Sequence, residues 1–174
     1  MKLETDRLIL RELTLNDVDA LHEILSDPVS MQHYPQPFTR EKTEGWITWN
    51  QKNYVTYGFG LWAVLLKENN QFIGDCGITM QHINGNLEPE IGYHIHRAHT
   101  GRGYATEAAQ ACRNYAFDVL GLGKVFSYMK YTNLASQKVA QKNGMRLLGE
   151  LPDEVNGITT VYAITLEEYH SLKK

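Results

Sequence analysis

The 174-residue sequence has only two cysteines, Cys76 and Cys112, and they do not form a Cys-x-x-Cys motif. Isolated thiols in a chain of this size argue against a disulfide-stabilised scaffold and favour a reducing compartment. No apolar run approaches the ~18 residues of a membrane-spanning helix, and the charged residues 1–7 lack the apolar core of a signal peptide. We therefore expect a cytoplasmic protein that does not enter a membrane.

Positive charge is also scarce, since 17 lysines and arginines stand against 20 acidic residues for a net charge of −3. Nucleic-acid binding needs a concentrated basic face, so a direct nucleic-acid partner is disfavoured, while a small basic patch for one anionic ligand is still compatible. The hydrophobic content of 43% is enough for the core of one domain, which we expect to span residues 1–174.

The apolar pattern predicts a mixed α/β sheet in which a hairpin comes first and strand–helix–strand units follow. No repeat or linker divides the chain. We expect about seven strands, at residues 8–13, 60–66, 72–80, 87–96, 124–130, 145–149 and 159–166, and about four helices, at residues 14–25, 39–54, 103–120 and 133–143.

A Gly-x-Gly turn, Gly101-Arg102-Gly103, separates an expected strand from an expected helix. Glycine lets the backbone approach a ligand, and the first N–H groups of a helix can bind a pyrophosphate. Each such interaction is worth about 0.3–1 kcal/mol, so several donors must act together. A tight turn without a ligand is the alternative interpretation. Thr106 stands where a dinucleotide-binding G-x-G-x-x-G motif needs its third glycine, which disfavours that fold.

The same segment closely resembles the acetyl-CoA-binding motif of GNAT acetyltransferases, Gln/Arg-x-x-Gly-x-Gly/Ala. It aligns with residues 98–103, where Ala98 departs from the first position. Three further stretches resemble the ribosomal-protein N-acetyltransferase (RimJ/RimL-like) branch: residues 5–11 (TDRLILR), 90–93 (EIGY) and 133–145 (NLASQKVAQKNGM). Together they span residues 5 to 149 in the order and spacing of that branch.

The resemblance implies a GNAT fold, with a mostly antiparallel sheet whose fourth and fifth strands splay apart. Acetyl-CoA would bind as cosubstrate, with its pantetheine arm in the gap between these strands. The residues implied in cofactor binding are His94, Ile95 and His96 for the arm, His99, Thr100, Gly101, Arg102, Gly103, Tyr104, Ala105 and Thr106 for the pyrophosphate, and Asn133 and Ser136 near the thiol end.

The resemblance also directs attention to the acid and the base of acetyl transfer. The tyrosine that often serves as general acid in the family is replaced by Ala140, so Ser136 is the nearest substitute. Ser136 could equally satisfy an N–H group of its own helix. Glu90 lies where many family members have a catalytic carboxylate, with Glu88 as the second choice. A glutamate of ordinary pKa, ~4.3, is a poor base unless burial raises its pKa or water relays the proton; an exposed, non-catalytic carboxylate is the alternative.

Three histidines, His94, His96 and His99, raise the question of a metal, because His-x-His places two imidazoles on one side of a strand. No cysteine, aspartate or glutamate lies at ligand spacing beside them, so we expect no metal site. Histidines that line an acceptor cleft or are exposed fit better. Trp46, Trp49 and Tyr54 could wall this cleft, although aromatic residues at helical spacing are more often core.

The acceptor is constrained only by its basicity. At pH 7 a peptide α-amine, of pKa ~7.7–8.0, loses its proton at a cost of ~1–1.4 kcal/mol, whereas a lysine costs more than ~4 kcal/mol. We therefore expect an N-acetyltransferase that acts in a ternary complex on a protein N-terminal α-amine or a small amine, as a monomer or homodimer. A non-catalytic acyl-CoA-binding module and a metal hydrolase are the competing hypotheses.

Overall fold

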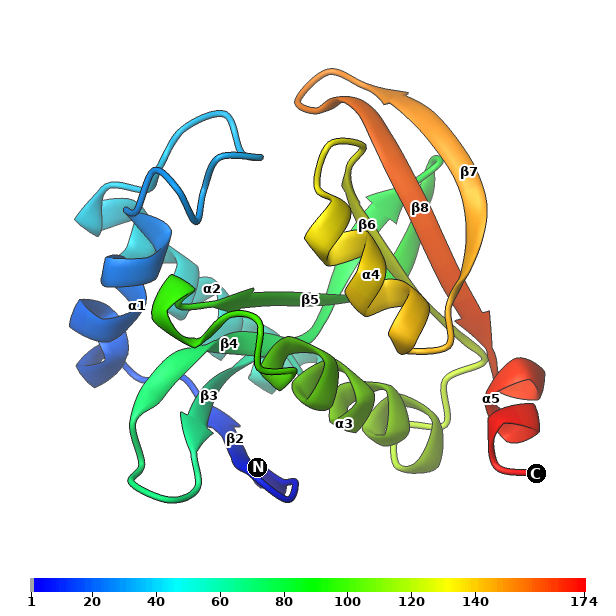
Figure 1. Ribbon diagram of the computed structural model, residues 1–174, viewed down its shortest axis with the longest axis horizontal. Helices are drawn as coiled ribbons and strands as arrows, with labels where there is room; N and C mark the ends of the chain where they lie inside the picture. The colour runs from blue at the N-terminus through cyan, green and yellow to red at the C-terminus, as the bar shows by residue number, and fades with distance from the viewer. Residues whose placement is uncertain (1) are drawn as a thin grey trace.

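The computed structural model describes residues 2–174 and is built around an eight-stranded sheet in the order β1-β2-β3-β4-β5-β6-β8-β7 (Figure 1). The strands are β1 (Lys2–Glu4), β2 (Leu8–Glu12), β3 (Leu61–Leu66), β4 (Phe72–Ile83), β5 (Asn86–Ile95), β6 (Lys124–Lys130), β7 (Arg146–Asp153) and β8 (Gly157–Thr165). The helices are α1 (Val18–Leu25), α2 (Arg40–Tyr57), α3 (Tyr104–Asp118), α4 (Leu134–Lys142) and α5 (Leu166–Leu172), with short 3₁₀ turns η1 (Leu15–Asp17) and η2 (Arg97–His99).

The expected mixed, mostly antiparallel α/β sheet is confirmed, with one more strand and one more helix than expected. The three residues of β1 are too few to show a period in the sequence and are ordered by pairing with β2. The last strand ends at Thr165, where the sequence pattern continued it to Leu166. Thr165 caps α5 by accepting a hydrogen bond from the Glu168 N–H, so the chain turns into a helix at that point.

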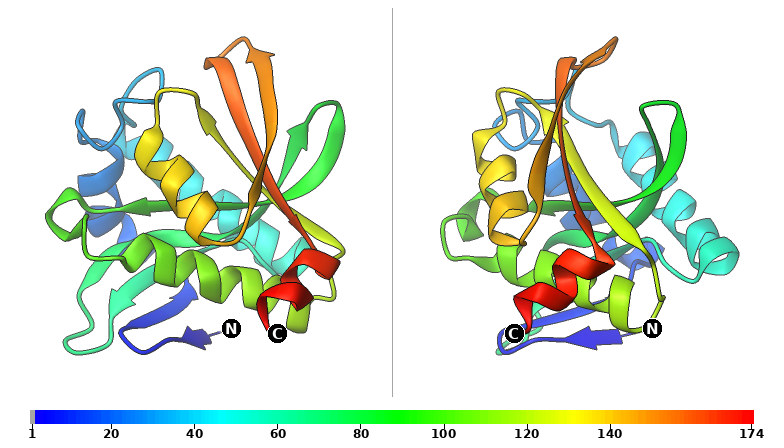
Figure 2. Two further views of the ribbon diagram at one scale, coloured as in Figure 1. Left: turned by 45° about the vertical axis from the view of Figure 1, so that its right-hand side comes forward. Right: turned by 90° about the vertical axis from the view of Figure 1, so that its right-hand side faces the viewer.

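Both faces of the sheet are covered at β3, which is buried along its whole length. Successive side chains of a strand point to opposite faces. Trp62 and Val64 therefore pack in the core that includes the buried residues of α3, and Ala63 and Leu65 pack in the core under α1 and α2. In the right-hand view of Figure 2, α2 and α4 lie on opposite sides of the sheet.

The sheet opens at one place, between β5 and β6. β5 pairs with β4 from Asn86 to Ile95, but it pairs with β6, in parallel, only at Glu90 and Phe126. A hydrogen bond from Ser127 Oγ to the Ile91 carbonyl oxygen, 2.7 Å long, is the next link. Beyond it the two strands diverge (Figure 1), as expected for the fourth and fifth strands of the sequence prediction. In residues 2–174, no helix has the length and apolar character needed to cross a membrane.

Candidate active site

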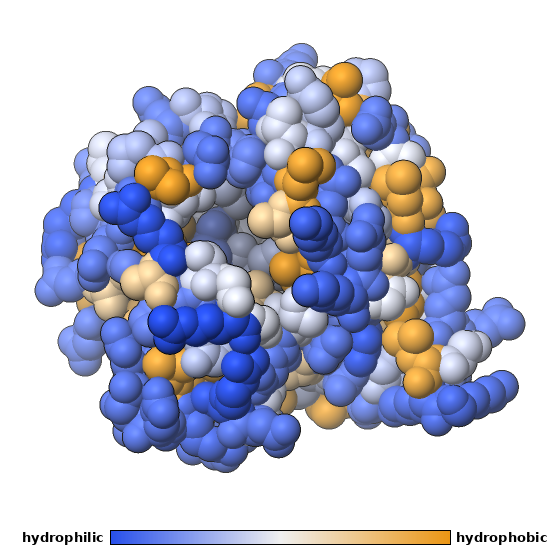
Figure 3. Space-filling model, viewed as in Figure 1, coloured by the Kyte–Doolittle hydropathy of each residue, from blue (hydrophilic) through white to orange (hydrophobic). Residues whose placement is uncertain are grey.

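A cavity of about 680 Å³ occupies the opening between β5 and β6. Its walls come from these two strands, from the turn at residues 97–103, from the first turn of α3, from α4 and from the segment between α1 and α2. Figure 3 shows the molecule hollowed at its centre, between the side that carries α1 and the side that carries α4. The cavity thus connects the predicted cofactor turn with the predicted catalytic residues.

The Gly-x-Gly turn forms one end of this cavity. Gly101 and Gly103 have φ values of 77° and 81°, a left-handed conformation that side chains other than glycine rarely adopt. Gly103 is the N-cap of α3 and has no side chain to bond the first N–H groups of the helix, so these donors are open to an anion. His99 Nδ1 is buried here without a hydrogen-bond partner among the described residues. Free N–H groups and an unpaired imidazole nitrogen fit a pyrophosphate.

Arg7 braces the same turn and was not singled out as a functional residue by the sequence analysis. Its Nε donates to Glu107 Oε2 at 2.7 Å, its Nη1 donates to the Arg102 carbonyl oxygen at 3.0 Å, and its guanidinium lies 4.4 Å from the ring centre of Tyr104. Burial alone would raise the pKa of Glu107, but hydrogen bonds from Thr5 and Arg7 lower this pKa overall. The TDR sequence of residues 5–7 therefore supports the cradle from outside the cavity.

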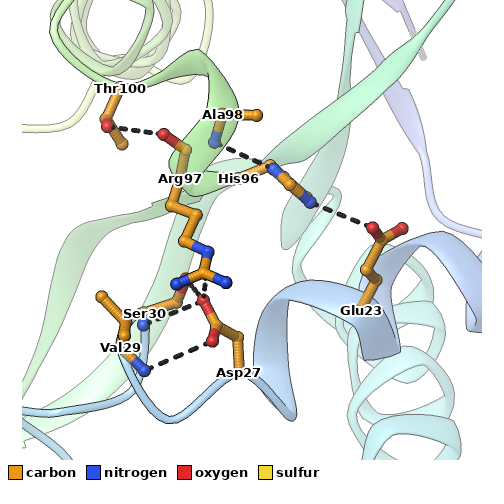
Figure 4. Close-up of polar contacts among 8 residues, drawn as sticks. All are labelled: Glu23, Asp27, Val29, Ser30, His96, Arg97, Ala98 and Thr100. Atoms are coloured by element: carbon orange, nitrogen blue, oxygen red, sulfur yellow. Dashed lines mark hydrogen bonds and ion pairs between the residues drawn. The ribbon is translucent and has the colours of Figure 1, made fainter.

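The turn η2 links the cradle to the α1 side of the molecule (Figure 4). Arg97 pairs with Asp27 at 3.4 Å, and the Asp27 carboxylate also accepts hydrogen bonds from Val29 and Ser30. His96 Nε2 lies 3.2 Å from Glu23 Oε1. The end of α1 and the segment that follows it are therefore held against the start of the cradle by the Arg97–Asp27 ion pair and by the contact between His96 and Glu23.

Only every second residue of β5 has its backbone N–H and C=O groups directed toward the gap between β5 and β6. The N–H of His96 donates to Ile73 at 2.7 Å, and the His94 carbonyl oxygen lies against Gly74, so both face β4. The Ile91 carbonyl accepts from Ser127 on the opposite side, and alternation assigns Ile95 to the side of Ile91. Of the residues predicted to pair with the arm, Ile95 is the one whose backbone faces the gap.

At the other end of the gap, Ser136 is hydrogen-bonded to Tyr93, which the sequence analysis did not consider as a site residue. Asn133 caps α4, with its Oδ1 accepting from the Ser136 N–H at 3.2 Å. The Ser136 hydroxyl donates to Tyr93 Oη at 3.1 Å, and the Tyr93 hydroxyl donates to the Ser136 carbonyl oxygen at 2.7 Å. Ala140, at the usual tyrosine position, is buried in the core. The hydroxyl groups of Tyr93 on β5 and Ser136 on α4 are thus paired in a site that lacks the usual tyrosine of the family.

Glu90 lines the cavity, and Glu88 is not among the lining residues. Burial raises the pKa of Glu90 to about 8, against the opposing effects of the Tyr128 backbone N–H and of His94. A carboxyl group with this pKa can exchange a proton near neutral pH, which an exposed glutamate does poorly. The environment of Glu90 therefore suits a base.

The aromatic residues divide between cavity and core. Trp46 lines the cavity, as do Tyr34 and Tyr128. Trp49 packs against Trp46, with ring centres 5.2 Å apart, and is not a lining residue. Tyr54 packs against the main core and hydrogen-bonds the backbone of Leu13 and Leu61.

His94 has other partners than His96 and His99, whose ring centres lie 6.1 Å apart. His94 contacts Asp75 and Tyr34, His96 contacts Glu23, and the ring of His99 lies 6.4 Å from that of Tyr104. Within residues 2–174, no three histidine, cysteine or acidic side chains are grouped in a way that could hold a metal ion.

Comparison with known proteins identifies the family of this chain. Residues 7–146 match the family model of the acetyltransferase (GNAT) domain. The uncharacterized protein YkkB of Bacillus subtilis (strain 168) is 41% identical over 145 residues, which cover 83% of this chain and 84% of YkkB.

Solved structures share the fold over nearly the whole chain. An acetyltransferase from Agrobacterium tumefaciens str. C58 superposes with a TM-score of 0.82 and 30% identity, covering 94% of each chain. The ribosomal L7/L12 α-N-protein acetyltransferase RimL in complex with coenzyme A superposes with a TM-score of 0.79 and 20% identity, covering 97% of this chain and 99% of RimL. The sequence-based recognition is confirmed: the chain is an acyltransferase and belongs to the GNAT acetyltransferase family.

Proposed function

We propose that this protein transfers the acetyl group of acetyl-CoA to a primary amine by direct attack in a ternary complex, and that the amine is the N-terminal α-amine of a protein or peptide or a small amine of similar basicity. One observation carries the proposal. A single cavity has a glycine cradle with free N–H groups at one end and the half-buried carboxyl group of Glu90, whose pKa is raised to about 8, in its wall.

Acetyl-CoA would bind with its pyrophosphate on the N–H groups of residues 99–106 and its arm along the Ile95 side of β5. When bound, it supplies an activated acetyl group as a thioester. The protein has to orient the thioester and keep the departing sulfur near a proton donor. Ser136 and Tyr93 are suited to this, because burial raises the pKa of Tyr93 and keeps its hydroxyl protonated. A thiol of pKa ~8.5 needs little help to leave.

The acceptor ammonium must lose a proton before its nitrogen can attack. A carboxylate with a pKa of about 8 matches an α-ammonium of pKa ~7.7–8.0, so this proton transfer is nearly balanced. Transfer from a lysine ammonium of pKa ~10.4 would be uphill by about 3 kcal/mol. Glu90 therefore favours an α-amine or another weakly basic amine. RimL, which shares the fold, is named for an α-N-protein acceptor.

A thiol-release assay with acetyl-CoA tests the proposal across a panel of peptides with free N-termini, polyamines and aminoglycosides. We expect the fastest release with a free peptide α-amine, and slower release with the same peptide when its N-terminus is blocked and only a lysine is free. Equal rates with both peptides would contradict the preference. Tight binding of acetyl-CoA without release for any amine would instead favour a non-catalytic acyl-CoA-binding module.

A further inference from the structure

Four side chains from separate elements form a hydrogen-bonded chain in the wall of the cavity. Asp75 of β4 is fully buried, and its Oδ1 lies 2.8 Å from His94 Nδ1. Its other oxygen, Oδ2, accepts from Trp46 Nε1 at 3.1 Å. His94 Nε2 lies 2.8 Å from the hydroxyl of Tyr34. Tyr34, Trp46 and His94 all line the cavity.

The direction of the bonds follows from the carboxylate. Because a carboxylate only accepts hydrogen bonds, Nδ1 of His94 carries the proton toward Asp75. In neutral His94 the Nε2 atom is then an acceptor, so the Tyr34 hydroxyl donates to it. The lone pairs of Tyr34 Oη are left for a proton or a donor in the cavity. This is the arrangement of a hydroxyl, a base and a group that orients the base.

The reaction provides a use for a second proton acceptor. An ammonium nitrogen carries three protons and the amide nitrogen of the product carries one, so two protons leave the nitrogen in each turnover. Glu90 can take the first of these, before attack. The second leaves after the carbon–nitrogen bond has formed, when the attacking nitrogen is positively charged and strongly acidic.

We propose that Tyr34, His94 and Asp75 form a relay that receives this second proton; the proposal rests on the amine acetylation described above. The proton passes from the nitrogen of the tetrahedral adduct to Tyr34 Oη, while the Tyr34 hydroxyl proton passes to His94 Nε2. The carbon–sulfur bond then breaks, and the thiolate takes a proton from solvent or from the Ser136–Tyr93 pair. His94 returns its proton to solvent when the products leave.

The charged and titratable groups that face His94 agree with this role. They are Asp75 from β4, Glu90 from the same strand and Tyr34 from the segment after α1, while α2 contributes the uncharged indole of Trp46. Burial lowers the pKa of His94, but Asp75 and Glu90 raise it overall. The relay therefore works once His94 has lost its proton, so its activity rises with pH.

His82 of β4 provides a matched control, because its side chain is exposed and does not line the cavity. The substitutions His94→Gln and His82→Gln therefore change the same side chain in two different environments. A glutamine at position 94 can still donate to Asp75.

The experiment measures kcat and KM from pH 5 to pH 10 with the amine of the panel that releases thiol fastest. His94→Gln is expected to lower kcat at least tenfold at its pH optimum, with KM for both substrates changed less than threefold. The acid limb of log kcat should lose about one unit of slope, because one of two required deprotonations is gone. His82→Gln should keep the wild-type slope. Tyr34→Phe, which leaves the Asp75–His94 pair intact, should show the same loss as His94→Gln.

Wild-type kcat and slope in folded His94→Gln would overturn the relay, and so would wild-type kcat in Tyr34→Phe. If His94→Gln does not fold, Tyr34→Phe still decides. An inactive Glu90→Gln together with fully active Tyr34→Phe would refute the relay and leave the acetyltransferase proposal standing. Absence of thiol release by the wild-type protein with every amine would refute both.

Discussion

Glu90→Gln should stabilise the protein while it removes activity, because the carboxyl group is held in an environment that disfavours its charge. Its pKa rises from 4.5 to about 8 on folding. Below pH 4.5 the group is protonated in both states and costs nothing. As the pH rises from 4.5 to 8, the unfolded chain releases this proton while the folded chain keeps it, so stability is lost across that window.

The magnitude follows from the two pKa values. One pKa unit corresponds to ~1.4 kcal/mol, so between pH 5 and pH 8 the free energy of unfolding of the wild-type protein should fall by up to about 3 kcal/mol relative to that of Glu90→Gln. The same substitution should lower kcat by ~10²–10⁴, the usual contribution of a general base. That loss should shrink as the pH approaches the pKa of the amine, because a neutral amine needs no base.

The assay is urea unfolding of both proteins at several pH values between 5 and 8, with kcat measured on the same samples. Glu88→Gln is the control, since Glu88 lies two residues away on the same strand and outside the cavity. A constant difference in stability across this pH range would refute the burial argument. A uniform loss of kcat across pH would mean that Glu90 positions the substrate and does not take its proton.

Three further predictions concern residues along the proposed acetyl-CoA site. Gly103→Val should raise the Kd of acetyl-CoA at least tenfold in isothermal titration, because a Cβ at φ 81° strains the cradle. Gly85→Val, at φ 82° in the β4–β5 turn, is the control for backbone strain alone. Equal affinity of both variants for acetyl-CoA would contradict the role of the cradle. Ser136→Ala should lower kcat more than it weakens acetyl-CoA binding, and equal losses would indicate that Ser136 only positions the cofactor. Arg7→Lys keeps a positive charge beside Glu107 but loses the hydrogen bond to the Arg102 carbonyl oxygen. The Kd of acetyl-CoA should therefore rise about fivefold, which corresponds to one hydrogen bond of ~1 kcal/mol. Unchanged affinity would show that Arg7 does not support the binding of acetyl-CoA.

Part of this site could be predicted from local patterns in the sequence. Gly101 and Gly103 stood out as a Gly-x-Gly turn between an expected strand and an expected helix, and Asn133 is a short polar residue that can cap the helix after it. Small residues recur at helical spacing along α3. These signals depend on neighbours within a few positions, so this turn and these helices could be predicted.

Other parts of the site depend on residues that are distant in the chain. Arg7 and Glu107 are 100 positions apart, and Tyr93 and Ser136 are 43 positions apart, so neither pair produces a local pattern. Asp75 in the sequence is a lone acidic residue in an apolar strand, and only the approach of His94 and Trp46 makes it part of a network.

The amino-acid pattern therefore identified the family and predicted the Gly-x-Gly turn and the place of Glu90 on its strand. The tertiary structure alone decided the proton affinity of Glu90, because a pKa depends on how completely other elements exclude water from the carboxyl group. It also decided which face of the cavity carries the Tyr34–His94–Asp75 chain. Backbone preferences act between neighbours along the chain, whereas desolvation and hydrogen bonding act between whatever the fold brings together.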